Sequence, residues 1–335
     1  MARPVRLLNI PDVTAAGQAT WGQLYGSARA LALTELAAGG DGPVLVIAPE
    51  PRSADRLRDE IAFFANDRLE VLLLPDSEAL PYDAFSPHPD ITSQRLRTLS
   101  RLPDLRNGVA IVALPTMMQR LPPVEWVLGS SLDLSVGQRL DSGAFRARLA
   151  SGVYTAVSQV TEHGEFTVRG SIIDIFPMGS DRPFRVDLLD DEIESIRTFD
   201  PDTQRSQAHQ RRASVLPARE FPFTREAIDS FRERFRRMFP VDLSRVSVYT
   251  DVAEGIAPGG IEFYLPLFYD ALNTLADYLP ESCRVVTVGD PVALADEAGG
   301  DGGGHQRGAG LDGLVRQPAI ERGTQGGGAV VGRRT

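Results

Sequence analysis

The sequence has 335 residues, of which 42% are hydrophobic, so it is long enough to bury the cores of two or three domains. The formal net charge of −10 and the pI near 5.0 exclude a surface that is basic throughout, so binding to nucleic acid would need a local positive patch. The single cysteine, Cys283, excludes an internal disulfide and a multi-cysteine metal site.

Two further absences bear on location and chemistry. The sequence has no run of about 18 apolar residues, and its first residues lack a signal-peptide pattern, so we expect a cytoplasmic protein without a membrane span. It contains no lysine, and all 35 basic residues are arginine. A genome-wide bias explains this composition most simply, but any mechanism that needs a lysine is closed to this chain.

Residues 1–120 are predicted to form an α/β domain. Short apolar runs bounded by glycine and proline alternate with helical patterns, which is typical of parallel strands covered by helices on both faces. The predicted elements are a helical region at 12–38, a strand at 43–48, a helix at 53–64 with Ser53 as its N-cap, and strands at 71–74 and 109–114.

From residue 121 to 216 the pattern changes to shorter segments of period two. Alternation of apolar and polar residues between turn residues indicates an antiparallel sheet with one solvated face. The predicted strands lie at 132–136, 166–170, 172–176, 184–188 and 193–199. We therefore expect a separate α+β domain in this range.

A helix is predicted after residue 217, with Thr224 as its N-cap and Pro240 at its end. Its apolar stripe comprises Ile228, Phe231, Phe235, Met238 and Phe239. One more strand, Val285–Val288, is expected to return to the first sheet. Residues 217–297 would then be the second segment of the α/β domain.

Residues 298–335 are rich in glycine and have no hydrophobic period, so we expect a disordered tail. A natural glycine linker is one interpretation. The abrupt loss of pattern after a strand also suits an out-of-frame translation, which we favour.

A nucleotide-binding P-loop needs glycines beside the phosphates, a lysine for the β- and γ-phosphates and a hydroxyl for magnesium. The nearest candidate is the segment Gly22–Ala30, with Gly26 and Ser27 at its centre. Ala28, Arg29 and Ala30 stand where the last glycine, the lysine and the hydroxyl residue should be. We therefore predict a degenerate site that cannot hydrolyse ATP. Taken alone, the Gly-Ser pair would be interpreted as a turn at a helix start.

A second segment imitates a nucleotide-binding motif. Val186–Glu192 is an apolar stretch followed by acidic residues, as in a Walker B strand, but it lies in the alternating domain. We interpret it as the end of a strand that runs into an acidic turn.

Several strings occur together in one order: Leu80–Asp90, Ser93–Leu96, Leu114–Arg120, Glu162–Gly170, Ile173–Gly179 and Phe199–Arg205. With these strings, residues 10–297 resemble the N-terminal region of the bacterial transcription-repair coupling factors, whose first segments are similar to the excision-repair protein UvrB. The glycine-rich tail departs from the family.

The resemblance implies the fold class α/β, with a degenerate helicase-like, P-loop-type parallel-sheet domain in two segments. The α+β domain at 121–216 would be an inserted UvrB-interaction-type domain of antiparallel strands. In the family the P-loop has decayed, which agrees with the substitutions at 28–30. UvrB also holds damaged DNA with a tyrosine-rich hairpin, whereas the matching stretch here is shorter and contains only Tyr82, so damage verification is not expected.

The resemblance also implies that the inserted domain binds the damage-recognition ATPase UvrA. By position, the arginines of that contact are Arg169 and Arg185, and Leu189 stands where the family often has an aromatic residue. Alternation along the strand predicts that the Arg185 guanidinium points to the solvated face. The alternative is that each arginine is a solvated strand residue or forms an internal ion pair with Glu165 or Asp187.

In the family the full chain is more than three times longer. It binds RNA polymerase and DNA and uses ATP and magnesium through segments that this sequence does not contain, and its C-terminal domain masks the UvrA-binding surface. For this chain we therefore expect no catalytic residue, cofactor or metal, a monomer, and UvrA as an unmasked partner. The sequence leaves two alternatives, a divergent helicase-like ATPase and a truncated product without function.

Overall fold

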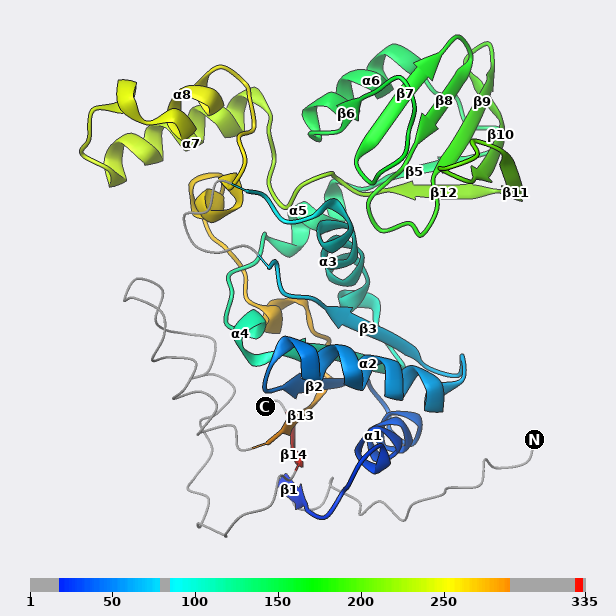
Figure 1. Ribbon diagram of the computed structural model, residues 1–335, viewed down its shortest axis with the longest axis vertical. Helices are drawn as coiled ribbons and strands as arrows, with labels where there is room; N and C mark the ends of the chain where they lie inside the picture. Colours follow the sequence, from blue (N-terminus) through cyan, green and yellow to red (C-terminus); the bar gives the residue numbers. More distant parts are fainter. Residues whose placement is uncertain (1–17, 79–84, 290–328, 334–335) are drawn as a thin grey trace. The chain divides into compact units, whose positions relative to one another are not determined.

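A computed structural model describes residues 18–78, 85–289 and 329–333 (Figure 1). The expectations for residues 12–17, for Tyr82 and for most of the tail lie outside these ranges. The chain forms two compact units. Unit 1 comprises Met1–Asp76, Arg101–Arg120 and Thr274–Thr335, and unit 2 comprises Ser77–Ser100 and Leu121–Asn273. Within the described ranges, none of the helices has the length and apolar character needed to cross a membrane.

Unit 1 is built on a six-stranded sheet in the order β1-β14-β13-β2-β4-β3. Its strands are β1 (Gln18–Trp21), β2 (Val44–Ala48), β3 (Glu70–Leu74), β4 (Gly108–Ala113), β13 (Arg284–Val288) and β14 (Ala329–Arg333). Strands β13, β2, β4 and β3 are parallel, and β13 pairs with β2. The predicted parallel sheet and the return of the strand at 285–288 are therefore confirmed.

Helices α1 (Ala28–Ala38) and α2 (Pro51–Ala65) pack on the parallel sheet of unit 1. Alternate residues of β2 share one core with these helices; Val46 of β2 lies there with Leu33 of α1 and Ile61 of α2. The short helix α4 (Leu114–Met117) follows β4, η1 (Leu102–Asp104) precedes it, and η4 (Leu275–Tyr278) precedes β13.

Two helix starts differ from the prediction. The helical region expected at 12–38 contains β1 and a loop before α1 begins, because Gly22 and Gly26 interrupt the pattern and Gly26 has φ +55°. Helix α2 begins at Pro51 with Glu50 as its N-cap, so Ser53 is an interior residue. Proline fixes φ near the helical value and needs no donor at the first helical position, which explains the earlier start.

Ala329–Arg333 belong to the range predicted as disordered, but they form β14 between β1 and β13. Val330 and Val331 explain this difference, because β-branched residues favour an extended backbone even after a glycine run. The rest of the predicted tail lies outside the described residues.

Unit 2 contains a six-stranded sheet in the order β11-β10-β9-β8-β7-β6. Its strands are β6 (Thr155–Ala156), β7 (Glu165–Arg169), β8 (Ile172–Ile175), β9 (Phe184–Leu189), β10 (Glu192–Phe199) and β11 (Ser206–Gln210). Each neighbouring pair in the series β7, β8, β9, β10 and β11 is antiparallel, and β6 is parallel to β7. The predicted antiparallel strands are confirmed, whereas β6 and β11 were not predicted.

The core of this sheet lies on one face, under the unpredicted helix α6 (Ser142–Ser151). Ile173, Val186 and Ile196 lie there with Phe145 and Leu149 of α6. A separate pair of strands, β5 (Leu132–Ser135) and β12 (Arg212–Val215), contributes Leu134 and Val215 to the same core.

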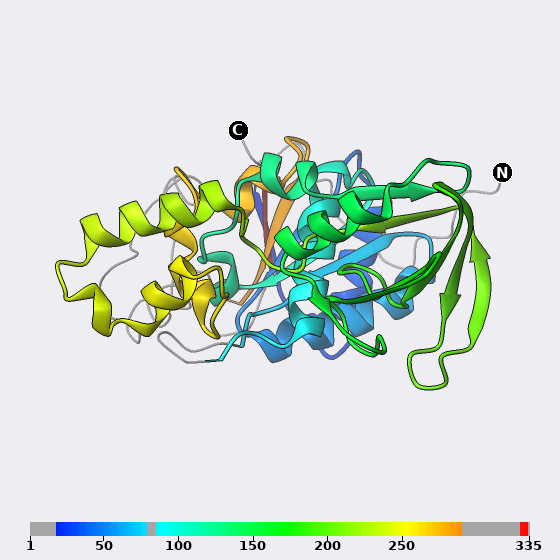
Figure 2. The same cartoon turned by 90° about the horizontal axis from the view of Figure 1, so that it is seen from above.

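The rest of unit 2 is helical: α3 (Pro89–Arg101), α5 (Val124–Gly129), α7 (Arg225–Met238), η2 (Leu243–Arg245), α8 (Ser247–Ala253) and η3 (Ile261–Leu267). Thr224 is the N-cap of α7 and accepts a hydrogen bond from the Ala227 amide, as predicted. Phe231 and Phe235 are buried in an aromatic core, whereas Met238 is exposed. Figure 1 and Figure 2 both show α7 and α8 side by side.

The predicted segment 217–297 is divided between the two units. Its first part, up to Asn273, groups with unit 2, and the part from Thr274 groups with unit 1. Two contacts tie the first part to unit 2. Glu220 accepts hydrogen bonds of 2.5 and 3.3 Å from the buried Arg95 of α3, and Leu121 forms a β-bridge with Asn273.

Candidate docking site on the antiparallel sheet

The face of the sheet opposite α6 carries charged residues on four neighbouring strands. Arg169 lies on β7, Asp174 on β8, Arg185 and Asp187 on β9, and Arg197 on β10. Asp174 is the Cα partner of Arg185, and Arg185 is the partner of Arg197. Because side chains alternate between the two faces of a strand, this register gathers three arginines and two aspartates into one polar patch.

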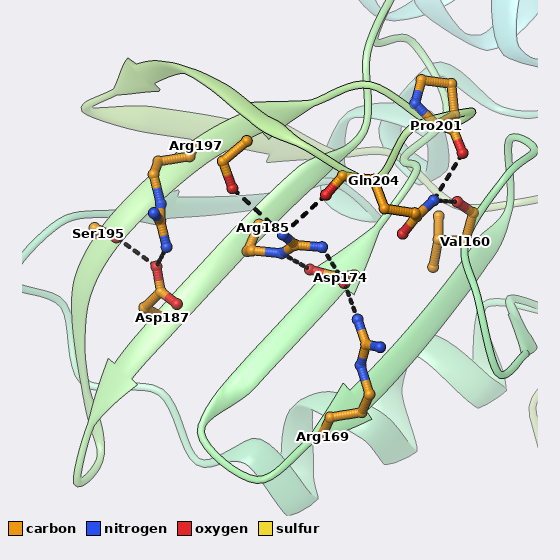
Figure 3. Close-up of polar contacts among 10 residues, drawn as sticks. Val160, Arg169, Asp174, Arg185, Asp187, Ser195, Arg197, Pro201 and Gln204 are labelled. Atoms are coloured by element: carbon orange, nitrogen blue, oxygen red, sulfur yellow. Dashed lines mark hydrogen bonds and ion pairs between the residues drawn. The ribbon is translucent and has the colours of Figure 1, made fainter.

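Asp174 is the centre of this patch (Figure 3). Its side chain is only 1% exposed, and its Oδ1 accepts a hydrogen bond of 2.7 Å from Arg185 Nε. Its Oδ2 accepts bonds of 2.9 Å from Arg185 Nη2 and 2.7 Å from Arg169 Nη2. One buried carboxylate therefore binds Arg185 in a two-pronged contact and Arg169 through a single nitrogen.

Arg185 is fixed by three further contacts. Its Nη1 donates to the Gln204 carbonyl oxygen at 3.2 Å and to Ser206 Oγ at 3.3 Å. Its guanidinium carbon lies 4.9 Å from the centre of the Phe199 ring. The hydrogen bonds to Asp174 raise the pKa of Arg185 above its usual value. The side chain points to the polar face, as predicted, but only 16% of it is exposed.

Arg169 is the more accessible of the two arginines, with 55% of its side chain exposed. Its other guanidinium nitrogens have no hydrogen-bond partner among the described residues. A guanidinium in this state can still bind a carboxylate from outside through its free N–H groups.

A second ion pair lies beside the first on the same face. Arg197 Nη2 donates to Asp187 Oδ2, which also accepts a hydrogen bond of 2.6 Å from Ser195 Oγ (Figure 3). Both charged side chains are partly buried. Asp187 is thus occupied by Arg197 and not by Arg185.

Leu189 ends β9 and is 64% exposed. It follows Arg185 and Asp187 on alternate positions of the strand, so it lies on the same face, about 13 Å along the strand from Arg185. Asp190, with φ +55°, and Asp191 then form the turn that leads into β10. The segment that imitated a Walker B strand is therefore a strand end with an acidic turn, as interpreted from the sequence.

The structure decides which internal ion pairs exist. Arg169 and Arg185 both pair with Asp174, so the partners anticipated from the sequence, Glu165 and Asp187, were wrong. Glu165 Oε2 instead accepts hydrogen bonds of 2.8 Å from the Thr161 amide and 2.9 Å from the Glu162 amide. The sequence does carry a signal for Asp174, since a single aspartate between Ile173 and Ile175 on an alternating strand must face away from the apolar core.

The P-loop-like segment lies in unit 1 and is unrelated to this patch. Strand β1 runs in the same direction as β2, because both are linked through β13 and the antiparallel β14. The loop after Trp21 therefore leaves the sheet at the carboxyl ends of the parallel strands. Ser27 is the N-cap of α1 but makes no side-chain capping bond, Arg29 is half-buried, and Ala30 is completely buried in the core.

Across residues 18–78, 85–289 and 329–333, no group of three or more His, Cys, Asp or Glu side chains is arranged to hold a metal ion.

Comparison with known proteins gives one family match and many similar sequences. Residues 132–221 match the family described as UvrB interaction domain, and this range contains every strand from β5 to β12. The transcription-repair-coupling factor of Escherichia coli strain K12 is 44% identical over 279 residues, which cover 83% of this chain and 24% of that protein. The same protein of Haemophilus influenzae is 41% identical over 266 residues, covering 79% of this chain and 23% of its own length.

A more distant relative, the transcription-repair-coupling factor of Bacillus subtilis strain 168, is 28% identical over 277 residues, covering 78% of this chain and 23% of its own length. The chain thus spans about a quarter of the length of the curated relatives it matches. These matches confirm the resemblance to the N-terminal region of the transcription-repair coupling factors.

Proposed function

We propose that this chain is the N-terminal docking region of a transcription-repair coupling factor and that it binds UvrA through the polar face of its antiparallel sheet. The observation that carries the proposal is the arrangement around Asp174. There, a buried carboxylate orients two arginines, and one of them keeps 55% of its side chain exposed. The patch lies within the range that matches the UvrB interaction domain.

The chemistry of the patch suits an acidic partner surface. Arginine binds carboxylates through paired N–H groups and is among the residues that dominate interface energies. Arg169 would make the direct contact, Arg185 would supply positive charge and hold the patch in shape, and Leu189 would contribute apolar area at its rim. Leucine offers less contact area than an aromatic residue and cannot stack, so its share of the affinity would be smaller.

Unit 1 would then be a scaffold that has lost its nucleotide chemistry. A complete burial of Ala30 and the absence of lysine support this part of the proposal, because neither the magnesium hydroxyl nor the phosphate-binding ammonium can be supplied. ATP-driven movement on DNA and displacement of stalled RNA polymerase, with ATP and magnesium, would belong to the rest of a longer protein. This chain would contribute the recruitment of UvrA.

The test is a binding titration of the full 335-residue chain with purified UvrA. We expect the chain to bind UvrA directly, because the exposed end of Arg169 can pair with a carboxylate of the partner. Arg169→Ala should weaken it at least tenfold, the effect of losing about 1.4 kcal/mol. A folded wild-type chain that retains no UvrA would refute the proposal.

A further inference from the structure

Strand β11 forms an open edge of the antiparallel sheet. It is the outermost strand, paired on one side with β10 (Figure 1). No other strand in the described ranges pairs with its second side, and all five of its residues, Ser206–Gln210, are exposed. An edge strand with free backbone groups is a template for the addition of one more strand.

The orientation of its backbone groups follows from one residue. The Ala208 amide points toward β10, where it donates to Thr198 Oγ1 at 3.2 Å. The register of the β10–β11 pair shifts between Arg197 and Phe199, so a bulge at Gln207 and Ala208 interrupts the alternation of amide directions, and the amide of His209 beyond it points away from β10. The outer edge therefore offers the amide donor and the carbonyl acceptor of His209.

The charge of this edge departs from that of the chain as a whole. Residues 203–215 carry Arg205, Arg211, Arg212 and His209 and no acidic residue, although the chain has a net charge of −10. Arg182 adds a further positive charge, since its Nη1 donates to the Gln207 side chain at 2.7 Å. The acidic residues nearby, Asp200 and Asp202, lie in the turn before the strand, where Asp200 accepts hydrogen bonds from Thr203.

The edge is continuous with the polar patch. Arg185 Nη1 contacts the Gln204 carbonyl and Ser206 Oγ, so the first residue of β11 touches the arginine that Asp174 orients. A partner that reaches Arg169 and Arg185 with carboxylates is therefore placed next to an open strand edge that is flanked by arginines.

We infer that the outer edge of β11 receives an extended, acidic segment of the docking partner as an added β-strand. The inference rests on the proposed function and extends it, because it specifies how UvrA would be bound beyond the contact with Arg169. Backbone hydrogen bonds to His209 would supply affinity, and Arg205 and Arg211 would select acidic side chains.

The test uses proline to remove the outward amide of His209. Proline is tolerated on an edge strand where the amide faces solvent, so His209→Pro should keep the fold, as checked by circular dichroism and thermal unfolding. His209→Ala, which keeps the amide, is the matched control. We expect His209→Pro to weaken UvrA binding about tenfold and His209→Ala to change it less than threefold.

Hydrogen exchange of the wild-type chain tests the same contact without a substitution, so the result does not depend on whether a variant folds. The amide of His209 should exchange rapidly in the free chain and become protected in the complex with UvrA. Unchanged exchange at this amide in a saturated complex would overturn the inference, as would a His209→Pro variant that binds like the wild type.

The two proposals fail in different ways. If the wild-type chain does not bind UvrA, the proposed function falls and the inference falls with it. If binding is lost in Arg169→Ala but kept in His209→Pro, only the inference falls. A basic edge could also attract nucleic acid, so a single-stranded oligonucleotide that protects the His209 amide when UvrA does not would assign the edge to that ligand and overturn the inference.

Discussion

Asp174 and Arg185 are Cα partners on adjacent antiparallel strands, and their side chains meet in two hydrogen bonds of 2.7 and 2.9 Å. The carboxylate is 1% exposed and the guanidinium 16% exposed, so water screens this ion pair little. Such a pair stabilises the fold less than its Coulomb energy suggests, because both charges lose hydration, but removing one partner leaves the other buried and uncompensated.

The first prediction concerns Asp174 itself. Asp174→Ala should lower the free energy of unfolding by about 3 kcal/mol, because it leaves the buried end of Arg185 without its carboxylate. Urea unfolding of the full chain measures this change. Asp181→Ala is the control, since Asp181 pairs with Arg97 on the surface and its loss should have little effect. Equal stability of the two variants would show that Asp174 does not hold the patch together.

The second prediction concerns pH and Tyr154. This buried hydroxyl donates to the Leu216 carbonyl at 2.5 Å and accepts from the Met178 amide at 3.2 Å. Burial raises the pKa of Tyr154 well above 10, so the folded state keeps the proton when the unfolded state has lost it. Its contribution to stability is therefore complete below pH 10 and decreases as the pH rises further, by up to about 1.4 kcal/mol per pH unit.

Tyr154→Phe isolates this effect. At pH 8 the variant should be less stable by about 1–3 kcal/mol, because the Met178 amide and the Leu216 carbonyl lose their partner. At pH 11 the gap between variant and wild type should be smaller, since phenylalanine does not titrate. Urea unfolding at the two pH values measures both gaps, and a gap that stays constant would contradict the assigned cause.

The third prediction compares two hydroxyl residues that the sequence presents alike. Thr224 caps α7 through a 3.3 Å bond from the Ala227 amide, whereas Ser53 lies inside α2 and donates to Glu50 Oε1 at 3.2 Å. Thr224→Ala should therefore destabilise the chain by about 1 kcal/mol, and Ser53→Ala by much less. If Ser53→Ala destabilised the chain as much as Thr224→Ala, Ser53 would be the N-cap of α2, and the start of this helix at Pro51 would be wrong.

The strands show which parts of the fold the sequence can predict and which it cannot. Apolar runs such as Val44–Ala48 and alternation such as Phe184–Leu189 predict strands, because burial on two faces or one leaves a direct trace in residue type. Strand β11 leaves no such trace, since Ser206–Gln210 are exposed on both faces. Strand β14 was missed for a different reason, because its short β-branched pair follows a glycine-rich run.

The sequence predicted the two arginines of the candidate site but not the carboxylate that binds them. The resemblance supplied Arg169 and Arg185, and alternation predicted the face to which Arg185 points. Their shared partner, Asp174, lies 5 and 11 residues away in the chain and reaches them across neighbouring strands. That pairing depends on the register of β7, β8 and β9, which no local pattern determines.

The fourth prediction concerns nucleotide binding by unit 1. Mg-ATP should leave the thermal unfolding temperature unchanged, because a ligand raises it only by binding the folded state, and Ala28, Arg29 and Ala30 stand in place of the glycine, lysine and hydroxyl residue of a P-loop. Differential scanning fluorimetry with and without millimolar Mg-ATP checks this. A rise of several degrees would instead support a divergent ATPase site. Ala30→Thr should not restore binding and should destabilise the chain by about 1–3 kcal/mol, because Ala30 is buried in the core.

The fifth prediction separates binding from stability at the docking patch. Arg169 is 55% exposed and uses one nitrogen for Asp174, so Arg169→Ala should leave the unfolding free energy almost unchanged while weakening UvrA binding. Arg185 is enclosed by Asp174, Gln204, Ser206 and Phe199, so Arg185→Ala should weaken binding and also lower stability by about 3 kcal/mol.

The decisive comparison is therefore a pair of measurements on two variants, binding by titration and unfolding by urea. Arg169→Lys adds a third point, because lysine keeps the charge but cannot bind Asp174 and an external carboxylate with one planar fork. Its affinity should fall between those of the wild type and Arg169→Ala. If all three variants lost binding only in proportion to lost stability, Arg169 and Arg185 would be parts of the fold and not of a docking surface.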